Sequence, residues 1–250
     1  MAGKYFTVEV KPTMTASLQH TTAMGGGDVL CDWTAFDIPK GGARLISVVA
    51  IVRGTDGTPQ TARDLEIYFA KSSNGGSTAP PTIGTINATA DGVGFANQIV
   101  GVAKLENTAG TDWKLHLDNF SVASTGHGAG PNQMSFGVLE GEPESGTNIG
   151  YDKLYLAILT AGALDFRSGM TVDGTPATSQ ANLDVEDVSA LTMLSPGDVI
   201  HDEDDRLMGT VKTITDANNV LMEDNLANAG VNDKKLYVLN PIKLVLSFEK

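Results

Sequence analysis

The sequence predicts an all-β protein, a jelly-roll-like β-sandwich with a small β-barrel module inserted before the last strand. Apolar and polar residues alternate with the period of two that a half-buried strand requires, and helix-length apolar periodicity is scarce. The 28 Gly residues, with many Thr, Ser, Asn and Asp, gather between the apolar runs, as in strands joined by turns. An acidic stretch of different texture precedes the final apolar run. A chain of 250 residues can bury a sizeable core.

The two ends of the chain carry the clearest alternating strands. In residues 4–11, Phe6 and Val8 fall on one face and Tyr5 and Thr7 on the other. Residues 242–250 alternate in the same way. Because pairing both segments with the same sheet leaves neither as a bare edge, we expect the termini to share one domain.

The interior of the chain supplies the remaining strands of the sandwich. The candidates are residues 43–54, 63–72, 97–105, 113–122 and 151–160. The first two are joined by GTDGTPQTA and predict a hairpin with Asp56 and Gly57 at its tip. About seven or eight strands with uneven, often long loops favour a jelly roll, and an immunoglobulin-like sandwich is the alternative.

A second unit is indicated by shorter, more acidic strands after about residue 170. Residues 180–240 hold 12 acidic and 4 basic side chains, and therefore about eight of the chain's 13 excess negative charges. Strands this short are what a small barrel requires. We therefore predict a sandwich of residues 1–170 completed by 241–250, and an acidic barrel module of residues 171–240.

Charge and composition limit the partners. A net charge of -13 repels phosphate backbones and anionic lipid, so neither nucleic acid nor a membrane is expected as a partner. The single cysteine, Cys31, excludes an intrachain disulfide and a multi-thiolate metal site. The chain starts without a secretory signal and lacks an apolar run of roughly 20 residues, so we expect synthesis in a cytoplasm.

The most site-like stretch is HDEDD, residues 201–205. Asp202, Asp204 and Asp205 are weak candidates for a metal site, because a calcium loop spaces its ligands two apart over about twelve residues, with a central Gly and a closing Glu that are missing here. Adjacent acids on one turn also titrate alike and make a poor catalytic pair. The alternative is a hairpin tip whose acids face water, with Gly209 marking a bulge or a close crossing of backbones.

Other catalytic and binding patterns are missing from the sequence. There is no Gly-x-Ser-x-Gly elbow, no phosphate loop and no dinucleotide fingerprint, so no catalytic residue and no cofactor is predicted. Five aromatic residues could stack against sugar rings, although most are expected in the core or in subunit contacts. They are Trp33, Phe36, Tyr68, Trp113 and Tyr151.

Three phrases carry a family resemblance. They are DVLCDWTAFDIPKGGARLISVVAIVRGTDGTPQTARDLEIYFAKS, VLEGEPESGTNIGYDKLYLA and SPGDVIHDEDDRLMGTVKTI. They resemble a family of virion structural proteins of tailed bacteriophages that infect marine cyanobacteria and their relatives, and the resemblance covers nearly the whole chain. The second unit also resembles a small β module that recurs in phage head and tail proteins.

The resemblance implies incorporation in a phage particle and carries no catalytic motif, so an enzyme is not expected. Closed β domains without a fibrous or coiled-coil segment suit a capsid decoration protein. We expect the major capsid protein or other virion proteins as partners, and a homo-oligomer, either a trimer or a lattice partner. The alternatives are a tail, neck or baseplate component and a host-glycan-binding adhesin.

Five residues are candidates for the contact with other virion proteins. They are Lys4, Phe6, Val8, Lys11 and His127. The first four belong to an N-terminal segment that could act as a docking arm, and His127 lies in the Gly-rich loop STGHGAGP. The alternative for the N-terminal segment, which we favour, is a first strand packed within its own sandwich.

Overall fold

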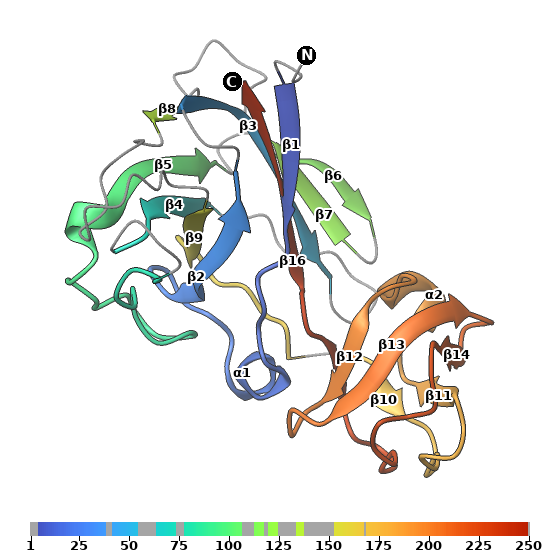
Figure 1. Cartoon of the computed structure of the whole chain (residues 1–250). Coiled ribbons are helices and arrows are strands. Elements are labelled where there is room, and N and C mark those ends of the chain that lie inside the picture. The colour runs from blue at the N-terminus through green and yellow to red at the C-terminus, as the bar shows by residue number, and fades with distance from the viewer. Residues whose placement is uncertain are drawn as a thin grey trace.

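The computed structural model describes residues 5–38, 42–54, 64–73, 78–106, 113–117, 120–124, 134–137, 153–167 and 169–249. They form a β-sandwich and a smaller β-barrel that touches one end of it (Figure 1). The sandwich strands are β1 (Tyr5–Val10), β2 (Val29–Asp37), β3 (Gly42–Arg53), β4 (Leu65–Lys71), β5 (Ile99–Leu105), β6 (Trp113–Leu117), β7 (Phe120–Ser124), β8 (Met134–Gly137), β9 (Lys153–Thr160) and β16 (Ile242–Glu249). The barrel strands are β10 (Thr171–Val172), β11 (Asn182–Glu186), β12 (Val199–Asp202), β13 (Leu207–Ile214), β14 (Asn219–Met222) and β15 (Leu236–Val238). Short helices are α1 (Ala16–Thr21), η1 (Ala96–Gln98) and α2 (Ala190–Met193).

The sandwich has the strand order of a jelly roll. One sheet runs β1-β16-β3-β7-β6, with β8 also pairing β3, and the other runs β2-β9-β4-β5. The antiparallel pairs β1 with β16, β2 with β9, β3 with β7 and β4 with β5 are nested in the chain. A long antiparallel ribbon that is rolled up gives this order. The predicted all-β fold with a jelly-roll sandwich is therefore confirmed.

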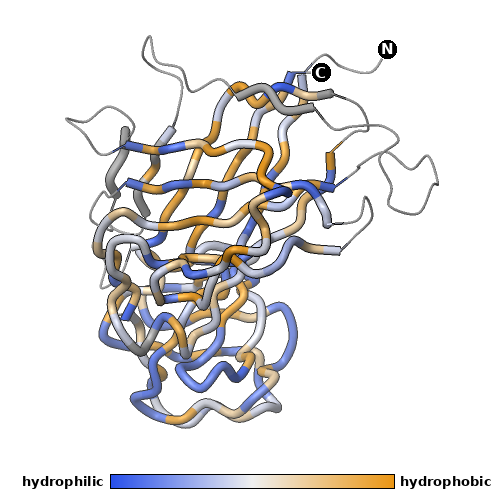
Figure 2. Tube along the Cα trace, turned by 90° about the vertical axis from the view of Figure 1, so that its left-hand side faces the viewer, coloured by the Kyte–Doolittle hydropathy of each residue, from blue (hydrophilic) through white to orange (hydrophobic). Residues whose placement is uncertain are grey.

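The core of the roll lies between the two sheets. In β16 the buried positions alternate strictly with partly exposed ones, and Figure 2 shows this alternation of apolar and polar positions along the strands. Phe248 of β16 stacks on Phe6 with ring centroids 5.0 Å apart and also meets Phe36. Each fully buried large apolar side chain contributes about 1.5–3 kcal/mol relative to exposure, so this layer is the main source of stability.

The outer faces of the two sheets differ. Over the sheet that contains β2 and β9, residues 78–98 pack with Ile83 against Val29, and Trp33 Nε1 donates to the Pro81 carbonyl at 2.7 Å. On the other sheet, Val49 and Val245 point outward between the buried positions of β3 and β16 and stay partly exposed. One sheet is thus covered by its own chain, and the other keeps partly exposed aliphatic side chains on its outside.

The barrel is nearly closed on itself. Its strands run β10-β11-β14-β13-β12-β15, and the two end strands meet where the Leu236 N–H donates to the Met170 carbonyl and the Val172 N–H donates to the Lys234 carbonyl, both at 2.9 Å. A core of its own fills the interior. Gly209 has a φ of +151° beside a register shift between β12 and β13, which bears out the bulge expected at this glycine.

Two strand predictions were wrong. The predicted hairpin of residues 43–54 with 63–72 does not form, because β3 belongs to one sheet and β4 to the other; its expected tip, Asp56 and Gly57, lies outside the described residues. The single strand predicted over 113–122 is instead the antiparallel pair β6 and β7. Within the described residues, no helix combines the length and apolar character needed to cross a bilayer.

Candidate functional site

Asp202 organises the acidic turn at residues 201–205. Its side chain is only 1% exposed. Oδ1 accepts the backbone N–H groups of Asp204 at 3.1 Å and Arg206 at 3.0 Å, and Oδ2 accepts Arg206 Nε at 2.7 Å. A carboxylate whose two oxygens are both occupied by donors of its own turn is a structural group, because it has satisfied the bonds that its burial demands.

The other acids of the turn also contact protein donors. Lys234 Nζ lies 2.6 Å from Glu203 Oε1 and 3.0 Å from Asp204 Oδ2. Asp205, at a φ of +62°, accepts the backbone N–H of Ser17 in α1 at 2.9 Å. Among the described residues, no three His, Cys, Asp or Glu side chains are grouped closely enough to hold a metal ion.

The expectation that these acids face water was wrong for Asp202, Glu203 and Asp205. Asp202 is buried and Glu203 and Asp205 are only partly exposed, whereas Asp204 is exposed as expected. Asp202 points inward because its Oδ1 accepts N–H groups of its own turn. Asp205 is partly covered because the turn rests against α1 of the sandwich.

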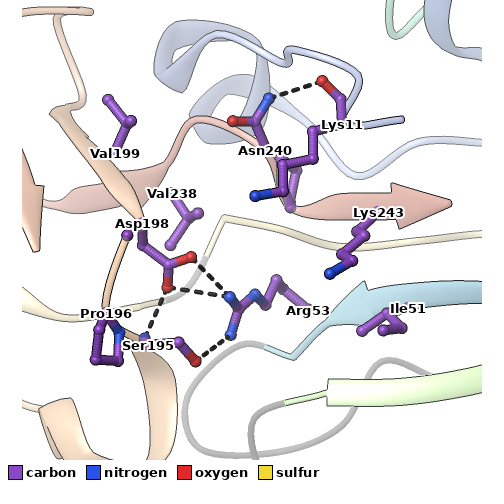
Figure 3. A pocket seen from close by; sticks show the side chains of 12 residues that line it. Lys11, Ile51, Arg53, Ser195, Pro196, Asp198, Val199, Val238, Asn240 and Lys243 are labelled. Carbon is purple, nitrogen blue, oxygen red and sulfur yellow. Dashed lines mark hydrogen bonds and ion pairs between the residues drawn. The ribbon is translucent and has the colours of Figure 1, made fainter. Parts of the chain in front are cut away.

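A cavity of about 290 Å³ lies in the corner between the sandwich and the barrel (Figure 3). We call it the corner pocket. It is lined by Lys11, Ile51, Arg53, Ser195, Pro196, Gly197, Asp198, Val199, Val238, Asn240, Pro241 and Lys243. These residues come from β3 and β16 of the sandwich, from the segment after β1, from residues 195–199 at the start of β12, and from residues 238–241 at the end of β15 and just after it.

The barrel wall of the pocket begins with the turn SPGD. The Asp198 N–H donates to the Ser195 carbonyl at 3.1 Å, and Gly197 has a φ of +89°. A turn with Pro in its second position and a positive φ in its third is of type II, which needs glycine there. The Pro196-Gly197 pair favours such a turn, and the turn places the Asp198 carboxylate at the edge of the pocket.

Arg53 and Asp198 join the two units through an ion pair. Arg53 Nη2 donates to Asp198 Oδ1 at 2.7 Å and to Oδ2 at 3.0 Å, and the Ser195 N–H donates to Oδ2 at 2.8 Å. The Arg53 and Asp198 side chains are 19% and 13% exposed. Burial raises the pKa of Asp198 above its ordinary value of 3.8, although Arg53 opposes that shift.

Two lysines stand across the pocket from this pair. Lys243 Nζ lies 2.6 Å and Lys11 Nζ 3.2 Å from the Glu9 carboxylate. The hydrogen bond from Lys243 is the largest cause that holds the pKa of Glu9 below its ordinary value of 4.5. Figure 3 shows the ammonium ends of both lysines directed toward the same space as the Arg53 guanidinium.

Backbone and amide contacts fix the corner. The Met14 N–H donates to the Leu239 carbonyl at 2.9 Å. Gln19, which is buried, donates through Nε2 to the carbonyls of Met14 at 2.8 Å and Val238 at 3.0 Å. Asn240 Nδ2 donates to the Lys11 carbonyl at 3.1 Å. These bonds hold the pocket walls in one arrangement.

The interface candidates are placed as follows. Phe6 and Val8 lie in β1 and pack against the sandwich core, and β1 pairs with β16 from Tyr5 to Val10. Lys11 lines the corner pocket. Lys4 and His127 lie outside the described residues. Of the interface candidates in the described part of the chain, Lys11 is the one that belongs to the pocket.

Sequence reasoning missed Arg53, Asp198 and Lys243 as site residues. They are far apart in the chain, and only the strand pairing of β3 with β16 and the insertion of the barrel bring them together. The SPGD turn was the one local signal, and it indicated a turn without indicating a partner for its aspartate.

Groups suited to chemistry are few elsewhere in the described residues. The core cluster between the two sheets is formed by apolar side chains and Cys31. Burial raises the pKa of the Cys31 thiol to about 12, which leaves it a poor nucleophile at neutral pH. Trp33 and Tyr68 pack beneath residues 78–98, so they do not form an open platform for a sugar ring.

No protein-family model matches this chain, and no curated protein or solved structure is significantly similar to it. The fold class therefore rests on the strand order, and the candidate site rests on the geometry of the corner.

Proposed function

We propose that the protein is a non-enzymatic structural component of a phage particle, a decoration protein that binds the outer capsid lattice and stabilises it. The observation that supports this proposal best is the way its polar side chains are used. The ion pair of Arg53 with Asp198 joins the two units. The ion pair of Asp202 with Arg206 stabilises a turn within the barrel. A rigid two-unit block of this kind can bridge neighbouring subunits and bear load.

The jelly roll and the sequence resemblance add to this support. Jelly rolls recur in viral capsid proteins, but lectins and cupins share the fold. The fold alone therefore does not distinguish a structural role from ligand binding, and the arrangement of polar groups has to be considered. A ligand-binding jelly roll needs polar groups that converge on its interior or on a groove. Here a hydrophobic cluster that includes the Cys31 thiol fills the space between the sheets, and the buried polar side chains Ser72 and Thr160 lie at the ends of β4 and β9. The aromatic residues Trp33 and Tyr68 are packed beneath residues 78–98.

The partners would be the major capsid protein or other virion proteins, with the protein acting as a homotrimer or as a lattice partner. Many copies on one particle make individually weak contacts strong collectively. The net charge of -13 suits an outer surface in salty water, where screening limits self-repulsion to a range of about one nanometre or less.

Reconstitution tests the proposal. Particles that lack the protein are incubated with purified full-length chain, and we expect binding to saturate at a fixed number of copies per particle and to raise resistance to heat and low salt. Asp204→Asn is the control variant and should bind normally, because Asp204 is 58% exposed. Depleted and complete particles of equal resistance would refute the stabilising role. Labelled protein found at the neck or tail in images would replace the capsid site with the tail alternative, and binding on a glycan array would favour the adhesin.

A further inference from the structure

The geometry points to a binding site for a single carboxylate in the corner pocket. The ligand is an Asp or Glu side chain, or a chain end, that a partner protein presents beside an apolar residue. The identity of that partner as a virion protein rests on the proposed function, whereas the chemistry of the pocket does not.

The charges around the pocket leave room for one anion. Lys11, Arg53 and Lys243 bring three positive charges, and Asp198 and Glu9 bring two negative ones. The corner therefore carries one net positive charge in a chain whose total is -13. One carboxylate balances this excess, whereas a phosphate dianion would exceed it.

The two lysines of the pocket are accessible to solvent and have N–H donors that Glu9 does not use. The side chains of Lys11 and Lys243 are 53% and 35% exposed. An ammonium group has three N–H donors, and Glu9 accepts from each lysine through one oxygen. A ligand carboxylate can therefore bind beside Glu9 without displacing the ion pairs that shape the site.

The apolar walls of the pocket favour a ligand that carries an aliphatic group beside its carboxylate. Ile51, Val199 and Val238 line the pocket together with Pro196 and Pro241. Burying an aliphatic group against them is favourable because it removes apolar surface from water. The volume of about 290 Å³ lies at the lower end of ligand pockets, which begin near 300 Å³. One carboxylate side chain with a neighbouring aliphatic side chain fits this space better than a large ligand.

A matched pair of small probes tests the site on the full chain. We expect 3-methylbutanoate to shift the backbone amide signals of Val199, Val238 and Asn240 in ¹H–¹⁵N spectra saturably, with a Kd in the millimolar range. The neutral match, 3-methylbutanamide, should shift them at least tenfold less at equal concentration. Inorganic phosphate should bind more weakly than 3-methylbutanoate. Equal effects of acid and amide, or tighter binding of phosphate, would overturn the proposal.

Three variants, each of which replaces one charged side chain by glutamine, test the contribution of single charges to binding. Lys243→Gln should weaken binding of 3-methylbutanoate about fivefold, the effect of one unit charge at about 4 Å in water. Glu9→Gln removes the competing carboxylate and should strengthen binding by a similar factor. Lys212→Gln, an exposed lysine on β13, should change it less than twofold. Equal effects of Lys243→Gln and Lys212→Gln would contradict the site.

Attachment to depleted particles then separates this inference from the proposed function. Lys243→Gln that is folded by circular dichroism should attach at least fivefold more weakly than the unaltered chain and Lys212→Gln. If all three attach equally, the pocket is not the docking point and the proposed function stands. If none attaches, the proposed function fails, and the probe titration alone decides whether the pocket binds a carboxylate.

Discussion

Replacing Asp202 is expected to destabilise the barrel by an amount that depends on which oxygen is lost. In Asp202→Ala, two backbone N–H groups lose the acceptor Oδ1, and Arg206 loses Oδ2. Hydrogen bonds to a charged group contribute about 1.5–3 kcal/mol each. Arg206 is 37% exposed, so water replaces much of its lost partner. The expected cost is about 3 kcal/mol.

Asp202→Asn separates the two contributions. The amide keeps an oxygen for the N–H groups of Asp204 and Arg206 but turns an NH₂ group toward the guanidinium. We expect a cost of about 1 kcal/mol, since only the more exposed contact is lost. Asp204→Asn, on the exposed side of the same turn, should change the free energy of unfolding by less than about 0.5 kcal/mol.

Urea unfolding combined with hydrogen exchange measures these values. Both tryptophans belong to sandwich strands, Trp33 to β2 and Trp113 to β6, so fluorescence reports the sandwich. Exchange of the backbone amides in β12 and β13 reports the barrel. Equal costs for Asp202→Asn and Asp202→Ala, or no cost for either, would refute the assignment of Oδ1 to the turn amides.

Three further predictions concern Asp198, Cys31 and Gly92. Asp198→Ala leaves the largely buried Arg53 without its carboxylate and should lower the free energy of unfolding by about 2 kcal/mol; urea titration measures the loss, and an unchanged midpoint would contradict the ion pair. At pH 8 the folded Cys31 should react with iodoacetamide about a thousandfold more slowly than a thiol of ordinary pKa 9.0, because its pKa is about 12 and only the thiolate reacts. Because that pKa is raised in the folded state, its contribution to stability is complete below pH 9 and is lost between pH 9 and 12, by up to about 1.4 kcal/mol per pH unit. Cys31→Ala should remove this part of the pH dependence and leave the part due to Tyr68, Tyr155 and Tyr237, whose pKa values burial also raises. Gly92→Ala would put a Cβ 2.1 Å from the Thr82 carbonyl oxygen, so we expect a Tm lower by several degrees, and an unchanged Tm would show that the segment over the sheet yields freely.

The alternation and turn residues of the sequence predict those elements whose conformation is set by their own residues. The alternation in β1 and β16, the Pro-Gly turn at Pro196 and the bulge at Gly209 all follow from the conformations that their own residues favour. The pairing of β3 could not be read in this way. Its neighbours β16 and β7 are distant in the chain, and a turn signal such as Asp56-Gly57 does not say whether the chain stays in one sheet or crosses to the other.

The candidate site shows the same limit. The acids of residues 201–205 predicted a turn, but not that Asp202 points inward, because that depends on Oδ1 meeting the N–H groups of its own turn. Asp residues commonly form such local bonds, so this signal was present in the sequence. The meeting of Arg53 with Asp198 had no local signal, since the insertion of the barrel alone brings them together.

The insertion of the barrel between β9 and β16 governs the order in which the chain can fold during synthesis. β16 lies between β1 and β3, so the first strand made has to wait for the last before its sheet can close. Roughly 80 residues separate β9 from β16, but barrel folding joins Met170 to Leu236 and reduces the free connection to roughly a dozen residues. By loop-closure entropy this favours the final pairing by about 1.5 kcal/mol. The barrel therefore guides the last strand of the jelly roll into its place.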